Sequence, residues 1–434
     1  MAVSAPALES ALADIVGREH VLAGRAALAT AAVDGLEPRW LVQPGTAEEV
    51  SRLLAVAGAE GLAVSPRGGG AAAGLGNPPK RLDLVLDLAR LNALIDYVPE
   101  DMVVTVGAGM TLGTLAGHLG KKGQMLALDP AGGGRRTVGG VLATAASGPL
   151  RFRYGTGRDL LLGVRFVQAD GTLTWGGARV VKSVTGYDVP KLLVGSLGTL
   201  GVIVEAVLRL HPLPPARATF AVGFDSPERA QALLGAVLDS PLEPDRVAVL
   251  NAPARRALEG PAVPALLVSF GSVEDAIRSQ GETLGGIAAT LHCRAERVSD
   301  PWDALERCLG GPVTLRLGCE IRRVMHWLGE VERAADRLSV PVSVAGEAGD
   351  GVLHIALGDG AAERPVVSEL VAPLRQGLGA EGGSLVVTQM PVALKAECDV
   401  WGPIAPDSLT IMKRIKLEFD PRGILNPGRF LGGI

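Results

Sequence analysis

The stretch Leu62-Ala63-Val64-Ser65-Pro66-Arg67-Gly68-Gly69-Gly70 joins a short apolar run to three consecutive glycines. We predict that its first three residues form a buried strand, because a short apolar run bounded by turn signals is typical of one. Glycine has no Cβ, so the loop amides are free to converge on an anion such as a pyrophosphate. A triple glycine is equally typical of a plain turn. The spacing is not Gly-x-Gly-x-x-Gly, which disfavours a nicotinamide-type dinucleotide site.

The flanks of this stretch alternate between helical and extended patterns. A helix is predicted over residues 48–61, strands over 84–87 and 102–106, and a helix over 111–119. Such alternation favours an α/β arrangement.

A second Gly-rich stretch covers residues 131–148, where small side chains occupy most positions. One interpretation is backbone that another molecule approaches closely. The other is a flexible loop in a chain rich in alanine and glycine.

The segment His211-Pro212-Leu213-Pro214-Pro215 is the predicted domain boundary, because proline fixes φ and removes donors, which prevents a strand or helix from continuing. A strand over 218–222 and a helix over 228–238 follow as a βαβ-type unit that recurs weakly to about residue 379. A helix is predicted over 407–419. A chain of 434 residues fits two domains.

Composition excludes several classes of protein. The net charge of −4 supplies no basic field for nucleic acid. No apolar run reaches the roughly 18–20 residues of a membrane span, and residues 1–20 lack a cationic start. We therefore expect a short amphipathic N-terminal helix and a cytoplasmic protein, at most peripheral to the inner membrane through partners. Four widely spaced cysteines predict free thiols and no local metal or iron–sulfur site.

Six motifs occur in an order that resembles the vanillyl-alcohol-oxidase (PCMH-type) family of FAD-binding flavoproteins. They are Pro66-Arg67-Gly68-Gly69-Gly70, Thr137-Val138-Gly139-Gly140, Arg158-Asp159-Leu160-Leu161-Leu162-Gly163, Lys182-Ser183-Val184-Thr185-Gly186-Tyr187-Asp188, Gly195-Ser196-Leu197-Gly198-Thr199-Leu200-Gly201-Val202-Ile203, and Phe419-Asp420-Pro421 with Asn426-Pro427-Gly428. Within the family, Gly123-Gln124-Met125-Leu126-Ala127, Ser147-Gly148-Pro149 and Leu197 are similar to the FAD-binding subunits of bacterial glycolate oxidases. Leu197 stands where catalytic relatives usually have Glu.

The resemblance implies an α+β fold. A two-part FAD domain would span residues 1–212, a smaller ferredoxin-like α+β cap domain 213–400, and a C-terminal segment 401–434 would return to the FAD domain. The pyrophosphate would lie on residues 67–70, and the flavin ring against 139–148 and 201–203. The implied cofactor-binding residues are Pro66, Arg67, Gly68, Gly69, Gly70, Ala71, Pro130, Thr137, Val138, Gly139, Gly140, Ala143, Ala146, Ser147, Gly148, Tyr154, Gly155, Arg158, Gly198, Gly201, Val202, Ile203 and Asn426.

Two departures from the family pattern matter. Several members attach FAD through a His beside the Gly-rich loop, where this chain has Ala71, Ala72 and Ala73, so FAD is expected to bind without a covalent link. Catalytic members also carry a His-x-Gly-Asp-Gly-Asn-Leu-His segment that holds a metal. Its counterpart here is Glu347-Ala348-Gly349-Asp350-Gly351-Val352-Leu353-His354, with no later Glu-His pair. Two donors make a weak site, so we predict no metal and a His354 that is satisfied on a cap strand.

Some charged residues have two interpretations. Asp188, next to Tyr187, either orders a turn or contacts the flavin or the substrate. Lys182 and Arg158 either stabilise the reduced flavin or pair with Asp188 and Asp159.

Three hypotheses follow for function. The leading one is an FAD-binding subunit of a glycolate-oxidase-like complex that carries electrons from 2-hydroxy-acid oxidation, with a catalytic sister flavoprotein and an iron–sulfur subunit as partners. The second is a self-sufficient 2-hydroxy-acid dehydrogenase for lactate or glycolate. The third is a subunit in which FAD is only structural. The catalytic residues are not identified by the sequence.

Overall fold

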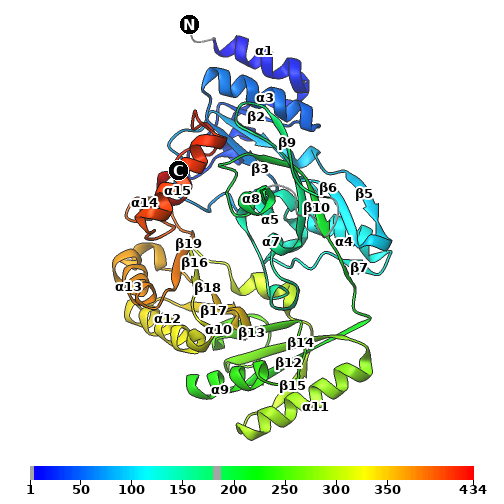
Figure 1. Cartoon of the computed structure of the whole chain (residues 1–434). Coiled ribbons are helices and arrows are strands. Elements are labelled where there is room, and N and C mark those ends of the chain that lie inside the picture. The colour runs from blue at the N-terminus through cyan, green and yellow to red at the C-terminus, as the bar shows by residue number, and fades with distance from the viewer. Residues whose placement is uncertain (1–3, 179–186) are drawn as a thin grey trace.

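A computed structural model describes residues 4–178 and 187–434. The chain forms two bodies, with the N-terminal helix α1 (Ala5–Val16) at the far end of the first and a large sheet in the second (Figure 1). The C-terminal helix α15 (Pro406–Phe419) returns to the first body, where Ile415 and Phe419 pack on its core.

The first body is built on three sheets. The four-stranded sheet has the order β1-β2-β4-β3 and contains parallel pairs, the five-stranded sheet has the antiparallel order β5-β6-β10-β8-β9, and β11 pairs with β7. The strands are β1 (Val21–Leu22), β2 (Trp40–Val42), β3 (Val64–Arg67), β4 (Leu84–Asp87), β5 (Leu94–Val98), β6 (Val103–Gly107), β7 (Gln124–Met125), β8 (Leu161–Val167), β9 (Leu173–Gly177), β10 (Val202–Arg209) and β11 (His211–Pro212). The helices are α2 (Arg25–Ala31), α3 (Ala47–Glu60), α4 (Leu112–Gly120), α5 (Val138–Thr144), α6 (Arg151–Tyr154), α7 (Gly157–Leu160) and α8 (Val189–Leu193).

The strand before the triple glycine starts later than the sequence predicts. Helix α3 ends on Gly61 with φ +65°, and the amide of Leu62 still bonds to the carbonyl of Ala57. Leu62 and Ala63 therefore lie in the connection, and β3 includes Pro66 and Arg67. β3 is at the sheet edge, where proline is tolerated because no neighbour needs its amide.

The C-terminal segment covers that edge. The amide of Val64 donates to the carbonyl of Ile424, and the amide of Asn426 donates to the carbonyl of Val64. Asp420 holds the turn by accepting the amides of Ile424 and Leu425. The motif around Asn426 is thereby fixed beside the glycine loop.

Two expectations for irregular segments are corrected. The Gly-rich stretch 131–148 contains the helix α5, which begins at Thr137, whose hydroxyl accepts the amide of Gly140. A flexible loop throughout is therefore wrong. His211 and Pro212 do form a short antiparallel strand, paired with Met125 and Gln124, although their sequence predicts none. Proline fits there because this ladder has two residues only.

The second body contains one eight-stranded sheet of order β15-β12-β14-β13-β17-β18-β16-β19, and every recorded pair in it is antiparallel. When β12 to β15 are numbered 1 to 4 in chain order, they lie in the sheet as 4-1-3-2. When β16 to β19 are numbered in the same way, they lie as 2-3-1-4. The predicted βαβ-type unit is thus a split one, in which the antiparallel β14 separates β12 and β13. The cap consists of two ferredoxin-like units joined edge to edge through β13 and β17.

These strands are β12 (Ala216–Gly223), β13 (Arg246–Leu250), β14 (Ala265–Ser272), β15 (Ala295–Val298), β16 (Val313–Gly318), β17 (Val342–Glu347), β18 (Val352–Leu357) and β19 (Ser384–Gln389). The main helices are α9 (Pro227–Leu238), α10 (Ala252–Ala257), α11 (Glu274–Thr290), α12 (Val324–Leu338), α13 (Ala372–Ala380) and α14 (Val392–Lys395), with a 3-10 segment η5 (Trp302–Cys308).

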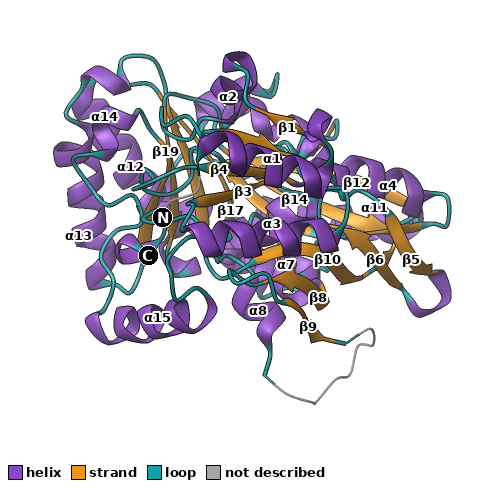
Figure 2. Cartoon of the chain, turned by 90° about the horizontal axis from the view of Figure 1, so that it is seen from above, coloured by secondary structure: helices purple, strands orange, loops and turns teal. Residues whose placement is uncertain are grey.

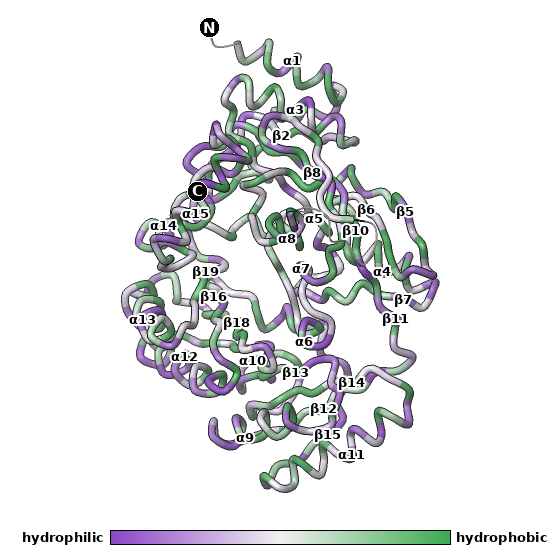
Figure 3. Tube along the Cα trace, in the orientation of Figure 1, coloured by the Kyte–Doolittle hydropathy of each residue, from purple (hydrophilic) through white to green (hydrophobic). Residues whose placement is uncertain are grey.

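The two faces of the cap sheet differ. Leu315, Leu353 and Ile355 belong to the core that the sheet forms with helices such as α12 and α13. These helices lie together along one side of the strands in the view from above (Figure 2). In Figure 3 the strands are mostly hydrophobic (green), and the outer helices α9 and α12 have more hydrophilic residues (purple), as expected for helices with one face on the core and one in solvent. The alternate residues Arg316 and His354 therefore point to the opposite face, towards the first body.

The fold is α+β, as expected. We propose domain bounds of 1–212, 213–400 and 401–434, because all eight strands of the cap sheet lie between Ala216 and Gln389. Across residues 4–178 and 187–434, no helix is long and apolar enough to cross a membrane.

Candidate active site

The glycine loop is held against its neighbours so closely that side chains would not fit. A Cβ at Gly69 would lie 2.9 Å from the carbonyl oxygen of Arg135, and one at Gly68 would meet the hydroxyl of Thr137. Gly70 has φ +75°, in the left-handed region that favours glycine. The guanidinium of Arg67 donates to the carbonyl of Thr30 at 2.6 Å, so the loop backbone is left to face the cavity.

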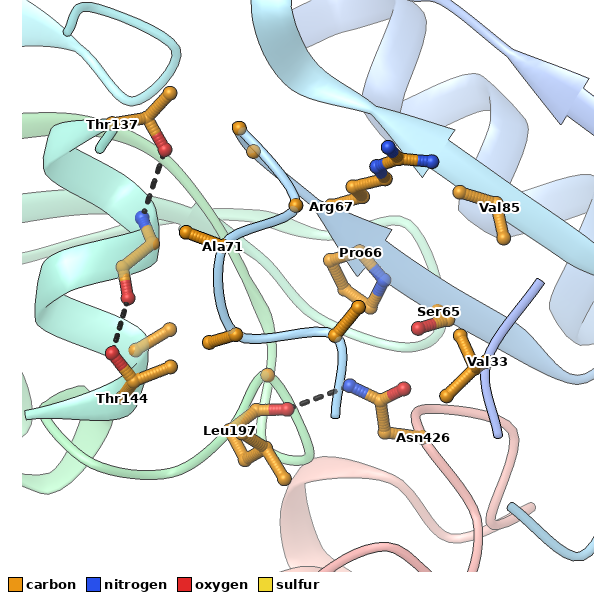
Figure 4. A pocket seen from close by; sticks show the side chains of 18 of the residues that line it. Val33, Ser65, Pro66, Arg67, Ala71, Val85, Thr137, Thr144, Leu197 and Asn426 are labelled. Carbon is orange, nitrogen blue, oxygen red and sulfur yellow. Dashed lines mark hydrogen bonds between the residues drawn. The ribbon is translucent and has the colours of Figure 1, made fainter. Parts of the chain in front are cut away.

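The cavity beside this loop, here named the glycine-loop cavity, is shown in Figure 4. Thr137 and Thr144 lie on α5, which forms one wall, and Ser65, Val85 and Val33 lie on the opposite side. Its lining is Ala31, Ala32, Val33, Ser65, Pro66, Arg67, Gly68, Gly69, Gly70, Ala71, Ala72, Ala73, Val85, Arg136, Thr137, Gly140, Val141, Ala143, Thr144, Leu197, Gly198, Asn426 and Arg429.

Three further cavities adjoin it: two share lining residues with the glycine-loop cavity itself, and the third shares lining residues with one of these two. An inner cavity adds Leu88, Ala108, Gly139, Gly201, Val202 and Ile203. A cap cavity shares Ala71, Ala72, Arg136 and Thr144 with the glycine-loop cavity and reaches the cap sheet. A junction cavity shares Ala131, Ser147, Leu309 and His354 with the cap cavity. Together they form a path from the interior of the first body to the cap.

Most of the residues predicted to bind the cofactor line this path. Pro130, Ala146 and Ser147 line the cap cavity, and Gly148 lines the junction cavity. All but four of the remaining predicted cofactor-binding residues line the glycine-loop cavity or the inner cavity. The four residues outside all these linings are Val138, Tyr154, Gly155 and Arg158. Val138 is buried in the core, and the ring of Tyr154 lies 4.7 Å from that of His211.

Arg158 and Asp188, which had two interpretations from the sequence, make local contacts. Arg158 on α7 donates to the carbonyl of Lys191, and Asp188 caps α8 and pairs with Lys191 at 2.8 Å, as the turn interpretation predicts. Tyr187 is 95% exposed. Lys182 and the rest of its motif up to Gly186 lie outside the described residues.

An FAD fits the path on two observations. Asn426 and Arg429 line the glycine-loop cavity, and each carries a buried polar atom without a hydrogen-bond partner, Oδ1 of Asn426 and Nε of Arg429. Buried polar atoms without partners are rare in proteins unless a bound molecule completes them. The close approach at Gly68 and Gly69 leaves backbone on the wall, as a pyrophosphate requires.

The cap cavity has a strongly cationic lining. It contains Arg136, Arg151, Arg316 and His354, and no Asp or Glu is among its described lining residues. The Arg316 side chain makes no hydrogen bond or ion pair within the described part of the chain. Burial lowers its pKa, and the nearby Glu347 opposes that effect. Among the described residues, the side chain of Arg151 forms one ion pair, with Asp350 at 3.8 Å, and one hydrogen bond, to the hydroxyl of Ser147.

Beside these arginines, His354 and Glu347 form a close pair. Nε2 of His354 lies 3.2 Å and 3.1 Å from the two carboxylate oxygens of Glu347. Burial by itself would raise the pKa of Glu347, but the charge and hydrogen bond of His354 outweigh it and hold that pKa below its usual value. The described residues contain no group of three His, Cys, Asp or Glu side chains placed to hold a metal.

A second ion pair joins the two bodies at the junction cavity. Asp129 of the first body accepts Nε of Arg246 on β13 at 2.9 Å, and also the amide of Leu150. Burial raises the pKa of Asp129 to about 6, although Arg246 opposes the shift. Arg246 also lies over the ring of Trp302 at 5.1 Å.

Arg136, Arg151, Arg316 and Arg429 are the site residues that sequence reasoning missed. Arg136 lies in the second Gly-rich stretch and Arg151 just after it, whereas Arg316 and Arg429 are distant in the chain, and no motif spacing relates the four. The only signal was position, since Arg136 directly precedes the Thr137 motif and Arg429 directly follows Gly428.

Comparison with known families agrees with the fold and the glycine loop. Residues 38–177 match the family described as FAD binding domain, and residues 403–430 match FAD linked oxidases, C-terminal domain. The chain therefore contains an FAD-binding domain and a C-terminal segment similar to that of FAD-linked oxidases. Both matched parts contribute to the lining of the glycine-loop cavity, with Asn426 and Arg429 in the second.

The similar proteins match this chain over most of its length. Glycolate oxidase subunit GlcD of Bacillus subtilis is 25% identical over 90% of this chain and 88% of that protein. D-2-hydroxyglutarate dehydrogenase of Xanthomonas citri pv. viticola is 29% identical over 90% of this chain and 89% of that protein. The structure of p-cresol methylhydroxylase with substrate bound superposes with a TM-score of 0.77 at 16% identity, over 98% of this chain and 96% of that one, which shows a shared fold.

Proposed function

We propose that this chain is an FAD-dependent dehydrogenase that oxidises a 2-hydroxy acid in the cap cavity. The observation that carries this proposal is the group Arg136, Arg151 and Arg316 beside the glycine-loop cavity, with no carboxylate in the described lining. A substrate carboxylate supplies the missing negative charge, and arginine binds it in a two-pronged geometry. The two relatives above are named for glycolate and D-2-hydroxyglutarate, both 2-hydroxy acids.

The cofactor-binding residues of the proposal are those predicted from the resemblance that also line the path, together with Arg136 and Arg429. The loop amides of Gly68 to Gly70 would bear the pyrophosphate. FAD supplies a two-electron acceptor for the C–H bond of the substrate. We propose that FAD is bound without a covalent link, because Ala71, Ala72 and Ala73 follow the glycine loop and no His, Cys or Tyr is among the described residues that line the glycine-loop and inner cavities.

We also propose that the chain works with partners. The reduced cofactor must pass its electrons on, and one relative is named as a subunit. The four cysteines are free thiols, and the described part of the chain holds no cluster that could bind a metal relay. An iron–sulfur subunit and a sister flavoprotein fit this need, and they would also account for a peripheral association with the inner membrane.

Flavin reduction in the absence of oxygen tests the function directly. The purified chain should show flavin absorbance, release FAD on denaturation, and lose its absorbance when mixed anaerobically with glycolate, D-lactate or D-2-hydroxyglutarate. Absence of flavin would refute the cofactor. Flavin that none of these acids bleaches would refute substrate oxidation on this chain.

That second result would favour an electron-carrying subunit, whose own substrate chemistry has been lost. The replacement of the first metal-segment histidine by Glu347 is the observation on its side. In that case a partner's substrate, added to the whole complex, should still reduce this flavin. A flavin that the complex never reduces would instead be structural.

A further inference from the structure

The pair Glu347 and His354 occupies the place where the family resemblance implies a metal, and the pair does not fit a metal. Both oxygens of Glu347 are directed to the same nitrogen of His354, at 3.2 Å and 3.1 Å. A metal held by both residues would need at least one further protein donor to form a stable site. The described residues provide no third donor.

The position of Glu347 makes it a fixed partner for this histidine. It ends β17, where it faces Ala248 of β13 in the middle of the cap sheet, and its side chain is only 4% exposed. A buried carboxylate has few ways to change partner, because water cannot replace the lost contact. Glu347 therefore holds the ring of His354 in one orientation.

The other ring nitrogen of His354 is available on the cavity side. Nε2 faces the Glu347 carboxylate, so a neutral ring that donates from Nε2 has Nδ1 as its acceptor. No hydrogen bond from the described residues reaches Nδ1. The side chain is 28% exposed and lines the cap cavity.

Arg316 is the direct cross-strand neighbour of His354, since β16 and β18 pair these two residues. Opposite residues on neighbouring strands have Cβ atoms roughly 4.5–5.5 Å apart and share a face of the sheet. Both side chains also line the cap cavity. A 2-hydroxy acid carries its carboxylate and its hydroxyl on adjacent carbons, so one bound substrate can contact both residues.

We propose that His354 accepts the hydroxyl proton of the substrate and that Glu347 is its positioning residue, so that this pair does the work of a metal. The inference rests on the proposed function. The O–H bond breaks with its proton moving to Nδ1, and the C2–H bond gives its hydrogen and electron pair to the flavin. The C–O bond becomes C=O, and the product is a 2-oxo acid. The negative charge of Glu347 balances the proton that His354 has gained.

The first test needs no variant. Wild-type protein is dialysed against EDTA, its metal content is measured, and flavin bleaching by the best 2-hydroxy acid is followed anaerobically by stopped flow. We expect substoichiometric metal and an unchanged rate. A stoichiometric metal whose removal stops bleaching, and whose return restores it, would overturn the inference and leave the proposed function standing.

The second test uses His354→Ala, His354→Gln and Glu347→Gln, with His118→Ala on the exposed face of α4 as a matched control. The two His354 variants should reduce flavin at least about 100-fold more slowly, the range of a lost general base, with FAD content unchanged. Added imidazole should restore part of the rate of His354→Ala. Glu347→Gln should lose less, and a 2-oxo acid should still perturb the flavin spectrum of every variant because Arg316 remains.

Bleaching at the wild-type rate in His354→Gln would refute the role of His354. Should the wild-type flavin not respond to any 2-hydroxy acid, the proposed function and this inference fall together, a result distinct from the metal result above.

Discussion

Replacing Arg316 by methionine separates binding from stability in one experiment. Methionine keeps much of the side-chain length and removes the charge. The guanidinium has no hydrogen bond or ion pair within the described residues, so its loss breaks no internal contact. It also removes a half-buried charge that lacks a partner, which costs folding free energy. We therefore expect the melting temperature of Arg316→Met to equal or exceed that of the parent.

Substrate affinity should change in the opposite direction. A hydrogen bond to a charged group is worth about 1.5–3 kcal/mol, which is roughly a 10- to 150-fold loss of affinity. The assay is titration of the oxidised flavin with the 2-oxo acid product, whose binding perturbs the flavin spectrum, with FAD content as a check. The matched control is Arg322→Met, an exposed arginine of the same domain whose ion-pair partner is Glu320. Affinity within twofold of the parent in Arg316→Met would refute the placement of the carboxylate.

Three further changes test other parts of the structure. Gly69→Val should yield folded protein without FAD, measured by flavin absorbance and circular dichroism, because its Cβ would lie 2.9 Å from the carbonyl oxygen of Arg135; Gly117→Val, with open space around it, should keep its flavin. Asp129 has its pKa raised from 3.8 to about 6 by burial, so the folded state holds that proton more tightly, and its stabilising contribution is complete below about pH 4 and is lost as the pH rises through 6. The unfolding free energy of Asp129→Asn minus that of the parent should therefore increase by up to about 3 kcal/mol from pH 4 to pH 7. A difference that does not change with pH would contradict this. Lys395→Met should lower the free energy of unfolding in denaturant by about 3–5 kcal/mol, because Asp34, only 6% exposed, loses its partner. The double variant with Asp34→Asn should recover part of this loss. Equal stability of the single and double variants would exclude this explanation.

The sequence identified the parts of the site that depend on local chemistry. Gly68 and Gly69 avoid a collision of a Cβ with Thr137 or Arg135, and Gly70 adopts φ +75°; such requirements are visible as a run of glycines. Thr137 and Asn426 belong to short motifs whose geometry is set within a few residues. Local signals of this kind survive without knowledge of the fold.

The cationic cavity had no such signal. Arg151 and Arg316 are 165 positions apart in the numbering and meet only because the cap sheet packs over α6. Arg158 was the more attractive candidate from its motif, yet its helix turns it to the surface towards Lys191. The strand at His211 and Pro212 was also missed, since its partner Met125 is distant in sequence and propensity gives no sign of it.

The βαβ-type unit that the sequence indicated as weakly recurring is present as two units of the cap, and this has a consequence for how the protein can change over evolutionary time. The two units meet through three residue pairs of β13 and β17, Ala248 with Glu347, Val249 with Gly346 and Leu250 with Ala345. Arg316 and His354 both belong to the later unit. The earlier unit carries neither and reaches the junction cavity through β13, so its outer strand β15 and its helices α9 and α11 are the parts that can diverge most freely. New surfaces for other proteins can accumulate there while the chemistry in the later copy is preserved.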